Sequence, residues 1–124
     1  MLETKTANIY IKDEIVHLVY KKGANVSLEA IEENLKAKIA IQKGKAMKTL
    51  VDVRAVWQYS DEAREVVSSK RFQKITIAMA VVVVGYSLAI KMIANFFMRI
   101  NKPVTPTKLF KKEANAIEWL KNYS

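Results

Sequence analysis

The spacing of apolar and polar residues predicts a hairpin followed by a helix at the start of the chain. Apolar and polar residues alternate over residues 8–12 and again over 15–21, and only two polar residues separate the two stretches. This pattern predicts two antiparallel β-strands joined by a very tight turn. From residue 28 to residue 39 the apolar residues recur at helical spacing, and the predicted helix ends before Gly44.

The rest of the chain alternates between short apolar strands and helices. Predicted strands cover residues 49–53, 77–84 and 108–110, and predicted helices cover residues 60–72, 86–100 and 114–123. An opening hairpin followed by alternating helices and strands is typical of an α/β fold with a mostly parallel sheet. We therefore expect one domain over residues 1–124, with about five strands and four helices.

The most apolar stretch, residues 75–98, is compatible with either a membrane span or a buried strand and helix. A lysine near the middle of a spanning helix costs about 2.5–3.5 kcal/mol, and Lys91 interrupts the run. Four consecutive valines at 81–84, followed by Gly85, favour a buried strand and a break. We therefore expect no transmembrane span. Because the amino terminus also lacks the pattern of a signal peptide, we expect a cytoplasmic protein.

Few residues of the chain are suited to catalysis or to metal binding. There is no cysteine, which excludes disulfides and thiolate sites, and there is one histidine. His17 lies in a predicted strand with no serine, cysteine or carboxylate motif beside it, so a structural role is favoured over a catalytic one. The three scattered glycines form no phosphate-binding loop. The sequence predicts no catalytic residue, no metal and no cofactor, and a protein that is not an enzyme.

Asp52 and Arg54 flank the end of a predicted buried strand. Ligands of α/β domains usually bind at this edge of the sheet, so the two residues are a candidate binding site. The alternative is an ion pair, or a capping carboxylate, that stabilises the turn after the strand. Trp57 and Tyr59 follow in a predicted loop, and both are amphipathic side chains suited to an interface.

Charge is unevenly distributed along a chain whose net charge is +9. No acidic residue occurs between Glu65 and Glu113, although this stretch contains many cations. They are Lys70, Arg71, Lys74, Lys91, Arg99, Lys102, Lys108, Lys111 and Lys112. Such a surface attracts acidic proteins or anionic lipid head groups, or it only keeps the domain soluble. Nucleic acid is disfavoured as a partner because no recognition motif accompanies these cations.

The predicted helix over residues 86–100 is too apolar to be covered fully by a small domain. Its polar residues recur every four positions and occupy about a quarter of its circumference, so an apolar strip is expected to remain exposed. The candidate interaction surface consists of Leu88, Lys91, Met92, Asn95, Phe96, Arg99 and Lys102. A second copy of the chain, forming a homodimer, is the simplest protein partner. Anionic lipid is the alternative.

The segments TLVDVR, NFFMRINKP, PTKLF and AIEWL, in this order of elements, resemble the SpoIIAA-like (STAS-like) families. The resemblance implies a repeatedly wound βα domain without enzymatic activity. Relatives act as anti-sigma-factor antagonists or as modules of larger regulatory and transport proteins. In the antagonists an Asp-Ser-Ser-Gly turn before a helix offers a serine for phosphorylation. The corresponding region here is VDVRAVWQYSDEAR, in which Ser60 stands at a comparable helix start.

Ser60 is therefore a candidate phosphosite or helix cap. Taken together, the sequence predicts a non-enzymatic regulatory or protein-interaction module. The alternative is a peripheral binder of anionic lipid that uses a basic, partly apolar helix.

Overall fold

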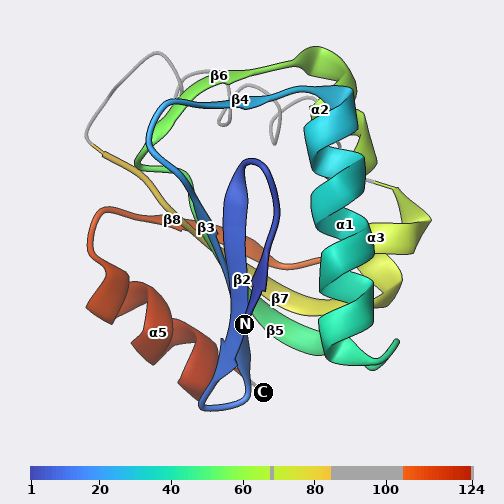
Figure 1. Ribbon diagram of the computed structural model, residues 1–124. Helices are drawn as coiled ribbons and strands as arrows, with labels where there is room; N and C mark the ends of the chain where they lie inside the picture. Colours follow the sequence, from blue (N-terminus) through green and yellow to red (C-terminus); the bar gives the residue numbers. More distant parts are fainter. Residues whose placement is uncertain (68, 85–104, 124) are drawn as a thin grey trace.

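A mixed β-sheet with helices on both faces forms the centre of the computed structural model, which describes residues 1–67, 69–84 and 105–123 (Figure 1). The six strands of this sheet are, in spatial order, β1 (Leu2–Glu3), β2 (Ala7–Lys12), β3 (Ile15–Tyr20), β5 (Met47–Asp52), β7 (Thr76–Val82) and β8 (Thr107–Phe110). β1, β2 and β3 pair antiparallel, whereas β3, β5, β7 and β8 pair parallel. The predicted α/β fold with a mostly parallel sheet is confirmed.

The helices divide between the two faces of the sheet (Figure 1). In the described part of the chain they are α1 (Leu28–Gln42), α2 (Asp61–Val67), α3 (Lys70–Lys74) and α5 (Glu113–Asn122). α1, α2 and α3 cover one face, and α5 covers the other. A sheet covered on both faces needs apolar residues on both sides of its central strands, and in β7 all residues except Ile77 are buried.

The opening hairpin has the tight turn that the sequence predicts. Lys12 pairs with Ile15, so Asp13 and Glu14 alone form the turn. Both residues have positive φ, at 52° and 64°. Positive φ at both central residues is the geometry of a type I′ turn, whose twist matches that of the flanking strands, and Asp is one of the residues that tolerate this conformation.

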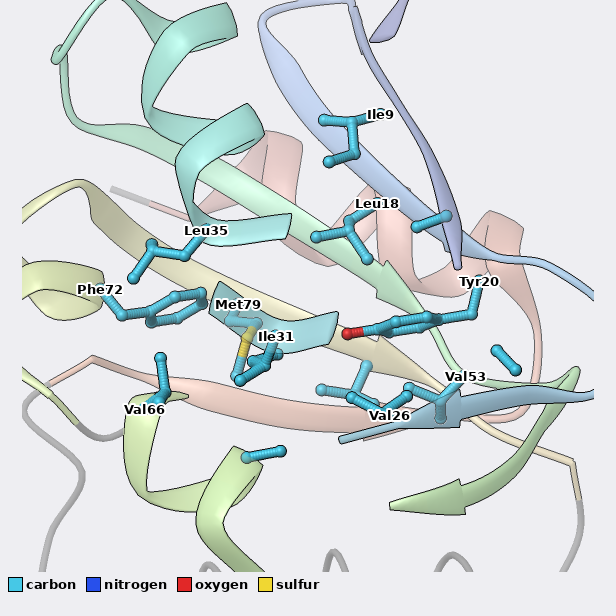
Figure 2. Packing of buried hydrophobic residues seen from close by; sticks show 14 of the residues in the cluster. Ile9, Leu18, Tyr20, Val26, Ile31, Leu35, Val53, Val66, Phe72 and Met79 are labelled. Atoms are coloured by element: carbon cyan, nitrogen blue, oxygen red, sulfur yellow. The ribbon is translucent and has the colours of Figure 1, made fainter. Parts of the chain in front are cut away.

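The larger core lies between the sheet and the helices α1 to α3 (Figure 2). Ile31 and Leu35 project from α1 toward Met79 of β7, and Phe72 of α3 lies beside them. Tyr20, at the end of β3, is 3% exposed, and burial raises the pKa of its hydroxyl far above the usual value. Removing these apolar side chains from water is the main contribution to the stability of this layer.

A smaller core lies under α5. Leu120 and Ala116 face Leu50 of β5 and the small residues Ala78 and Ala80 of β7. All five are fully buried, each at 0% exposure. The alanines let the helix approach the sheet closely, and Leu120 fills the space between the two.

The structure corrects two predictions about local structure and also contains strands that the sequence analysis does not predict. The predicted helix over residues 60–72 is two helices, because Ser69 caps α3 by accepting a hydrogen bond from the backbone N–H of Phe72 at 3.4 Å. The predicted loop around Trp57 is a strand, β6 (Val56–Tyr59), which pairs in parallel with β4 (Ala24–Val26) in a separate two-stranded sheet. The short edge strand β1 was not predicted either.

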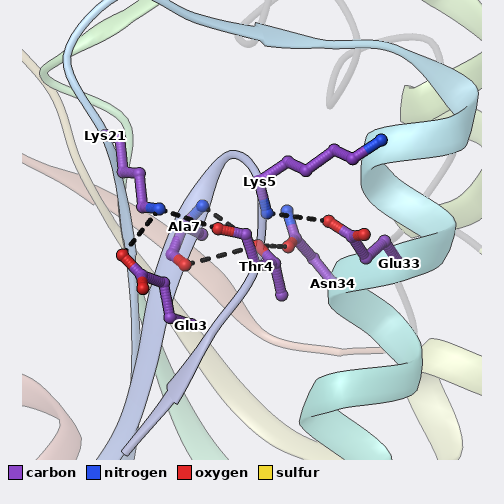
Figure 3. A network of polar contacts seen from close by, with 7 residues as sticks. All are labelled: Glu3, Thr4, Lys5, Ala7, Lys21, Glu33 and Asn34. Atoms are coloured by element: carbon purple, nitrogen blue, oxygen red, sulfur yellow. Dashed lines mark hydrogen bonds and ion pairs between the residues drawn. The ribbon is translucent and has the colours of Figure 1, made fainter.

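A row of polar residues on α1 is buried against the sheet. Asn34, Lys38 and Gln42 follow one another at intervals of four residues, and they are 0%, 0% and 3% exposed. Asn34 accepts a hydrogen bond from Thr4 Oγ1 (Figure 3). It also donates to Thr6 Oγ1 at 3.0 Å, and the two contacts tie the turn between β1 and β2 to the helix. The amide of Asn34 is therefore hydrogen-bonded although it is buried, as burial of a polar group requires.

Lys38 and Gln42 make their contacts with the start of β7. Lys38 Nζ donates to Thr76 Oγ1 at 3.0 Å and lies 5.1 Å from the centre of the Phe72 ring. Gln42 Nε2 donates to the carbonyl oxygens of Ile75 and Lys45 at 2.8 and 2.7 Å. The polar row thus joins α1 to three separate parts of the chain.

The second half of the apolar stretch lies outside the described residues. Its first half is β7, as predicted, and the predicted helix over residues 86–100 falls within the part that is not described. Of the helices in the described part of the chain, none is both long enough and apolar enough to cross a membrane.

Candidate functional site

Asp52 and Arg54 form an ion pair at the carboxyl end of β5. Arg54 Nη2 and Nε donate to Asp52 Oδ2 and Oδ1 at 2.7 and 3.0 Å, and the backbone N–H of Arg54 donates to Oδ1 at 3.0 Å. The Asp52 side chain is 9% exposed and that of Arg54 is 40% exposed. The hydrogen bonds that the Arg54 guanidinium donates to the Asp52 carboxylate raise the pKa of Arg54 above its usual value. Asp52 thus both pairs with the arginine and caps the turn after the strand.

A third charged residue, Glu113, approaches this pair from α5. Its Oε2 atom lies 3.8 Å from Arg54 Nη2. Glu113 is in the first turn of α5, where a carboxylate is favoured by the helix dipole. The contact joins residues that are far apart in the sequence, and no motif in the sequence indicates it. With two carboxylates around one guanidinium, the cluster stabilises the turn and the start of α5 and offers little attraction to an anion.

His17, in β3, lies on the same face of the sheet as Asp52. Its ring stacks on that of Tyr10 of β2, with the centres 4.8 Å apart and the planes 7° from parallel. Burial lowers the pKa of His17 below its usual value, so the neutral imidazole is favoured. Burial, together with the charges of Glu113 and Asp52, raises the pKa of Tyr10. The ring pair has a packing role, and the described residues contain no group of three His, Asp or Glu side chains that could hold a metal ion.

The surface around β6 and the start of α2 has a different character. Trp57 is 76% exposed, although it lies on a hydrogen-bonded strand, and its neighbour Gln58 is also exposed. Ser60 Oγ accepts a hydrogen bond from the backbone N–H of Ala63 at 3.1 Å, so Ser60 caps α2. We define the β6–α2 surface as the exposed residues Trp57, Gln58, Asp61 and Glu62 together with the half-buried Ser60.

β4 fixes the position of this surface. The backbone N–H of Ser60 donates to the carbonyl oxygen of Val26 at 3.0 Å, and the β6 strand pairs with β4 up to Tyr59. Val26 is fully buried, so β4 is anchored in the larger core. Trp57 and Ser60 are therefore held on a fixed support, which was not predicted because the pairing of β4 with β6 is a long-range contact.

The predicted interaction helix cannot be placed, since Leu88, Lys91, Met92, Asn95, Phe96, Arg99 and Lys102 all lie outside the described residues. The stretch without acidic residues suggests that its cations lack a nearby counter-charge, and for Arg71 the structure shows that this is wrong. Its Nη1 and Nη2 atoms donate to the Glu32 carboxylate of α1 at 3.1 and 2.6 Å. Lys108 Nζ lies 5.5 Å from the centre of the Phe110 ring.

Comparison with known proteins gives a family and a fold. Residues 9–124 match the family described as a domain of unknown function, DUF7793. The chain belongs to this family. The DUF7793 match begins within β2 and includes every later element, among them the ion pair, the β6–α2 surface and α5. No curated protein matches the sequence significantly.

Among solved structures, this DUF7793 protein is similar to an uncharacterised protein of the DUF3478 family from Shewanella loihica PV-4, which has a SpoIIAA-like fold. The TM-score is 0.62 at 18% sequence identity, and the alignment covers 97% of this chain and 98% of that one. At this identity the similarity shows the fold alone. The SpoIIAA-like resemblance predicted from the sequence is confirmed.

Proposed function

We propose that the protein is a non-enzymatic protein-interaction module of regulatory type that binds its partner through the β6–α2 surface. The observation that carries this proposal is the 76% exposure of Trp57. Tryptophan has a large apolar side chain and is enriched among the residues that contribute most to binding. Exposed on β6, it adds little to folding, whereas a complex that covers it removes its apolar area from water.

The surroundings of Trp57 indicate the chemistry of the partner. Asp61 and Glu62 are exposed in the first turn of α2, four and five residues after Trp57 in the sequence. A complementary partner offers an apolar pocket for the indole ring with basic residues beside it. Another protein, or a second copy of this chain with its net charge of +9, meets this description.

The test is a comparison of variants in partner capture from the native host. Trp57→Ala is expected to reduce recovery of a specific partner by about tenfold or more, because truncating a central tryptophan typically removes over 1.4 kcal/mol of binding free energy. Ile11→Ala is the matched control, since Ile11 is an apolar residue with 42% exposure on β2. Sedimentation velocity on the purified protein identifies self-association. A partner retained equally by both variants would contradict the proposal.

Ser60 gives this surface a candidate means of regulation. A phosphoryl group at the start of α2 would add negative charge beside Asp61 and Glu62, and we expect it to weaken binding of an acidic partner and to strengthen that of a basic one. Ser60→Asp places a charge at the cap, whereas Ser60→Asn keeps an equally good cap without charge. We expect partner affinity to change at least about fivefold in the first variant only. Identical affinities of the two variants would exclude control by charge at this position.

The alternative prediction, a peripheral binder of anionic lipid, depends on the segment 86–102. These residues lie outside the described part of the chain, and lipid binding stays a prediction from the sequence.

A further inference from the structure

A pocket of about 350 Å³ opens at the amino-terminal ends of β3, β5 and β7. Its walls come from the turn between β2 and β3, from the link between α1 and β5, and from the last turn of α5. In Figure 1 this is the lower end of the sheet, where the β2–β3 turn lies beside the end of α5, whereas β4 and β6 are at the upper end. The volume is within the range of pockets that bind small molecules.

A β-bulge creates the apolar part of this pocket. Met47 pairs with Thr76 and Thr49 pairs with Met79, so two residues of β7 lie opposite one residue of β5. Bulges turn side chains away from the direction that regular pairing would give them. Ile77 is consequently 44% exposed, between Thr76 and Ala78 at 4% and 0%, and it lines the pocket together with the buried Ile15.

Three lysines bring positive charge to the same pocket. Lys48 Nζ donates to the carbonyl oxygen of Tyr123 at 2.7 Å, which positions the ammonium group without neutralising it. Lys121 Nζ lies 3.7 Å from Asp13 Oδ2, and both side chains are more than half exposed, so this ion pair is weak. Lys45 is exposed at the rim.

We propose that this pocket binds a small organic monocarboxylate, with its apolar body against Ile77 and its carboxylate among the three lysines. The lining has three lysines against two acids, Asp13 and Glu14, which leaves one unbalanced positive charge. One net positive charge suits a monoanion, while the two acids repel a multiply charged anion such as a phosphate ester. The exposed isoleucine favours an anion with an apolar body over a purely polar one.

The test is a titration of the full chain with 2-naphthoate, in which binding is monitored by ¹H–¹⁵N NMR. We expect saturable shifts of the backbone amides of Lys45, Lys48 and Ile77 at probe concentrations up to about 10 mM. The uncharged analogue 2-naphthamide should bind at least about fivefold more weakly, because it lacks the charge that the lysines attract. Shifts that do not saturate, equal affinity for the amide, or shifts centred on Trp57 would each overturn the proposal.

Two variants and a control connect the binding to the pocket residues. Lys45→Gln removes an exposed charge at the rim and is expected to weaken 2-naphthoate binding at least about threefold, while Lys36→Gln, on the exposed side of α1, leaves it unchanged. Ile77→Asp places a like charge against the probe and is expected to abolish binding. An unchanged affinity in both pocket variants, with unfolding transitions like that of the wild type, would exclude this site. Partner capture through Trp57 is measured separately, so either proposal can fail alone.

Discussion

Lys38→Met is expected to raise the free energy of unfolding at pH 7 by about 3–4 kcal/mol. The Lys38 side chain is 0% exposed, and burial lowers its pKa from 10.5 to about 7. Residues 85–104, which the structure does not describe, contain no Asp or Glu, so they cannot supply a carboxylate to hold the charge. Methionine has a similar shape and no charge to bury. Lys36→Met, an exposed position on the same helix, is the control and should change stability by less than about 0.5 kcal/mol.

The same lysine makes the stability of the wild-type protein depend on pH. Because the pKa of Lys38 is lower in the folded state, the unfolded chain binds more protons between pH 7 and 10.5, and stability rises with pH in this window. The expected slope is about 1.4 kcal/mol per pH unit. Urea unfolding at pH 7, 8 and 9 should show this rise in the wild type and its absence in Lys38→Met.

Two other buried groups titrate outside that window. Because the pKa of His17 is lowered in the folded state, it reduces stability only below about pH 6.5. Because the pKa of Tyr20 is raised, it reduces stability only above about pH 10. A wild-type stability that is flat from pH 7 to 9 would mean that Lys38 keeps an ordinary pKa in the folded protein. That result would contradict its burial without a counter-charge.

Leu120→Ala is expected to lower the free energy of unfolding by about 2–5 kcal/mol, because a fully buried leucine leaves a cavity when it is truncated. The cavity would lie between α5 and β7, where the nearest sheet residues of β7, Ala78 and Ala80, are too small to fill it. Leu28→Ala is the matched control, since Leu28 is a leucine in a helix with 46% exposure, and we expect a change below about 1 kcal/mol. Both values come from urea unfolding.

Equal and small losses in the two leucine variants would show that α5 is not docked on the sheet. Since α5 contributes Lys121 to the proposed carboxylate pocket, 2-naphthoate binding offers a second measurement. Loss of stability in Leu120→Ala should be accompanied by weaker binding of the probe.

The sequence predicts well the elements that are determined by local patterning. Alternation around Asp13 and Glu14 predicts the hairpin, and the run of valines at 81–84 predicts a central strand buried on both faces. These features depend on neighbouring residues and on the number of faces that must be covered. The α/β class follows from the order of such elements.

Long-range contacts account for what the sequence does not predict. β6 forms because β4 supplies its hydrogen bonds, and the sequence of Val56–Tyr59 does not indicate that β4 is its partner. The exposure of Ile77 results from a bulge, which depends on how β5 and β7 pair. A lysine in a helix is expected on the solvent-exposed face, yet Lys38 is buried in contact with Thr76 and Phe72.

The candidate site was predicted only in part. The position of Asp52 and Arg54 at the end of a buried strand predicts their role at this site. The contribution of Glu113 comes from another element, and no pattern in the sequence indicates it. The pocket lysines are also scattered, and only the folded chain brings Lys45, Lys48 and Lys121 together. Single lysines in a strongly basic chain carry no signal of their own.

The buried polar row of α1 restricts the position of the helix along the sheet. An apolar helix face could slide along the sheet by one turn, about 5.4 Å, and still exclude water. Asn34, Lys38 and Gln42 each form a hydrogen bond with a different atom at a fixed position. Such a shift would therefore break all three hydrogen bonds and leave three buried polar side chains without partners. The lysine that weakens the fold at neutral pH therefore also helps to give α1 a single position over the strands.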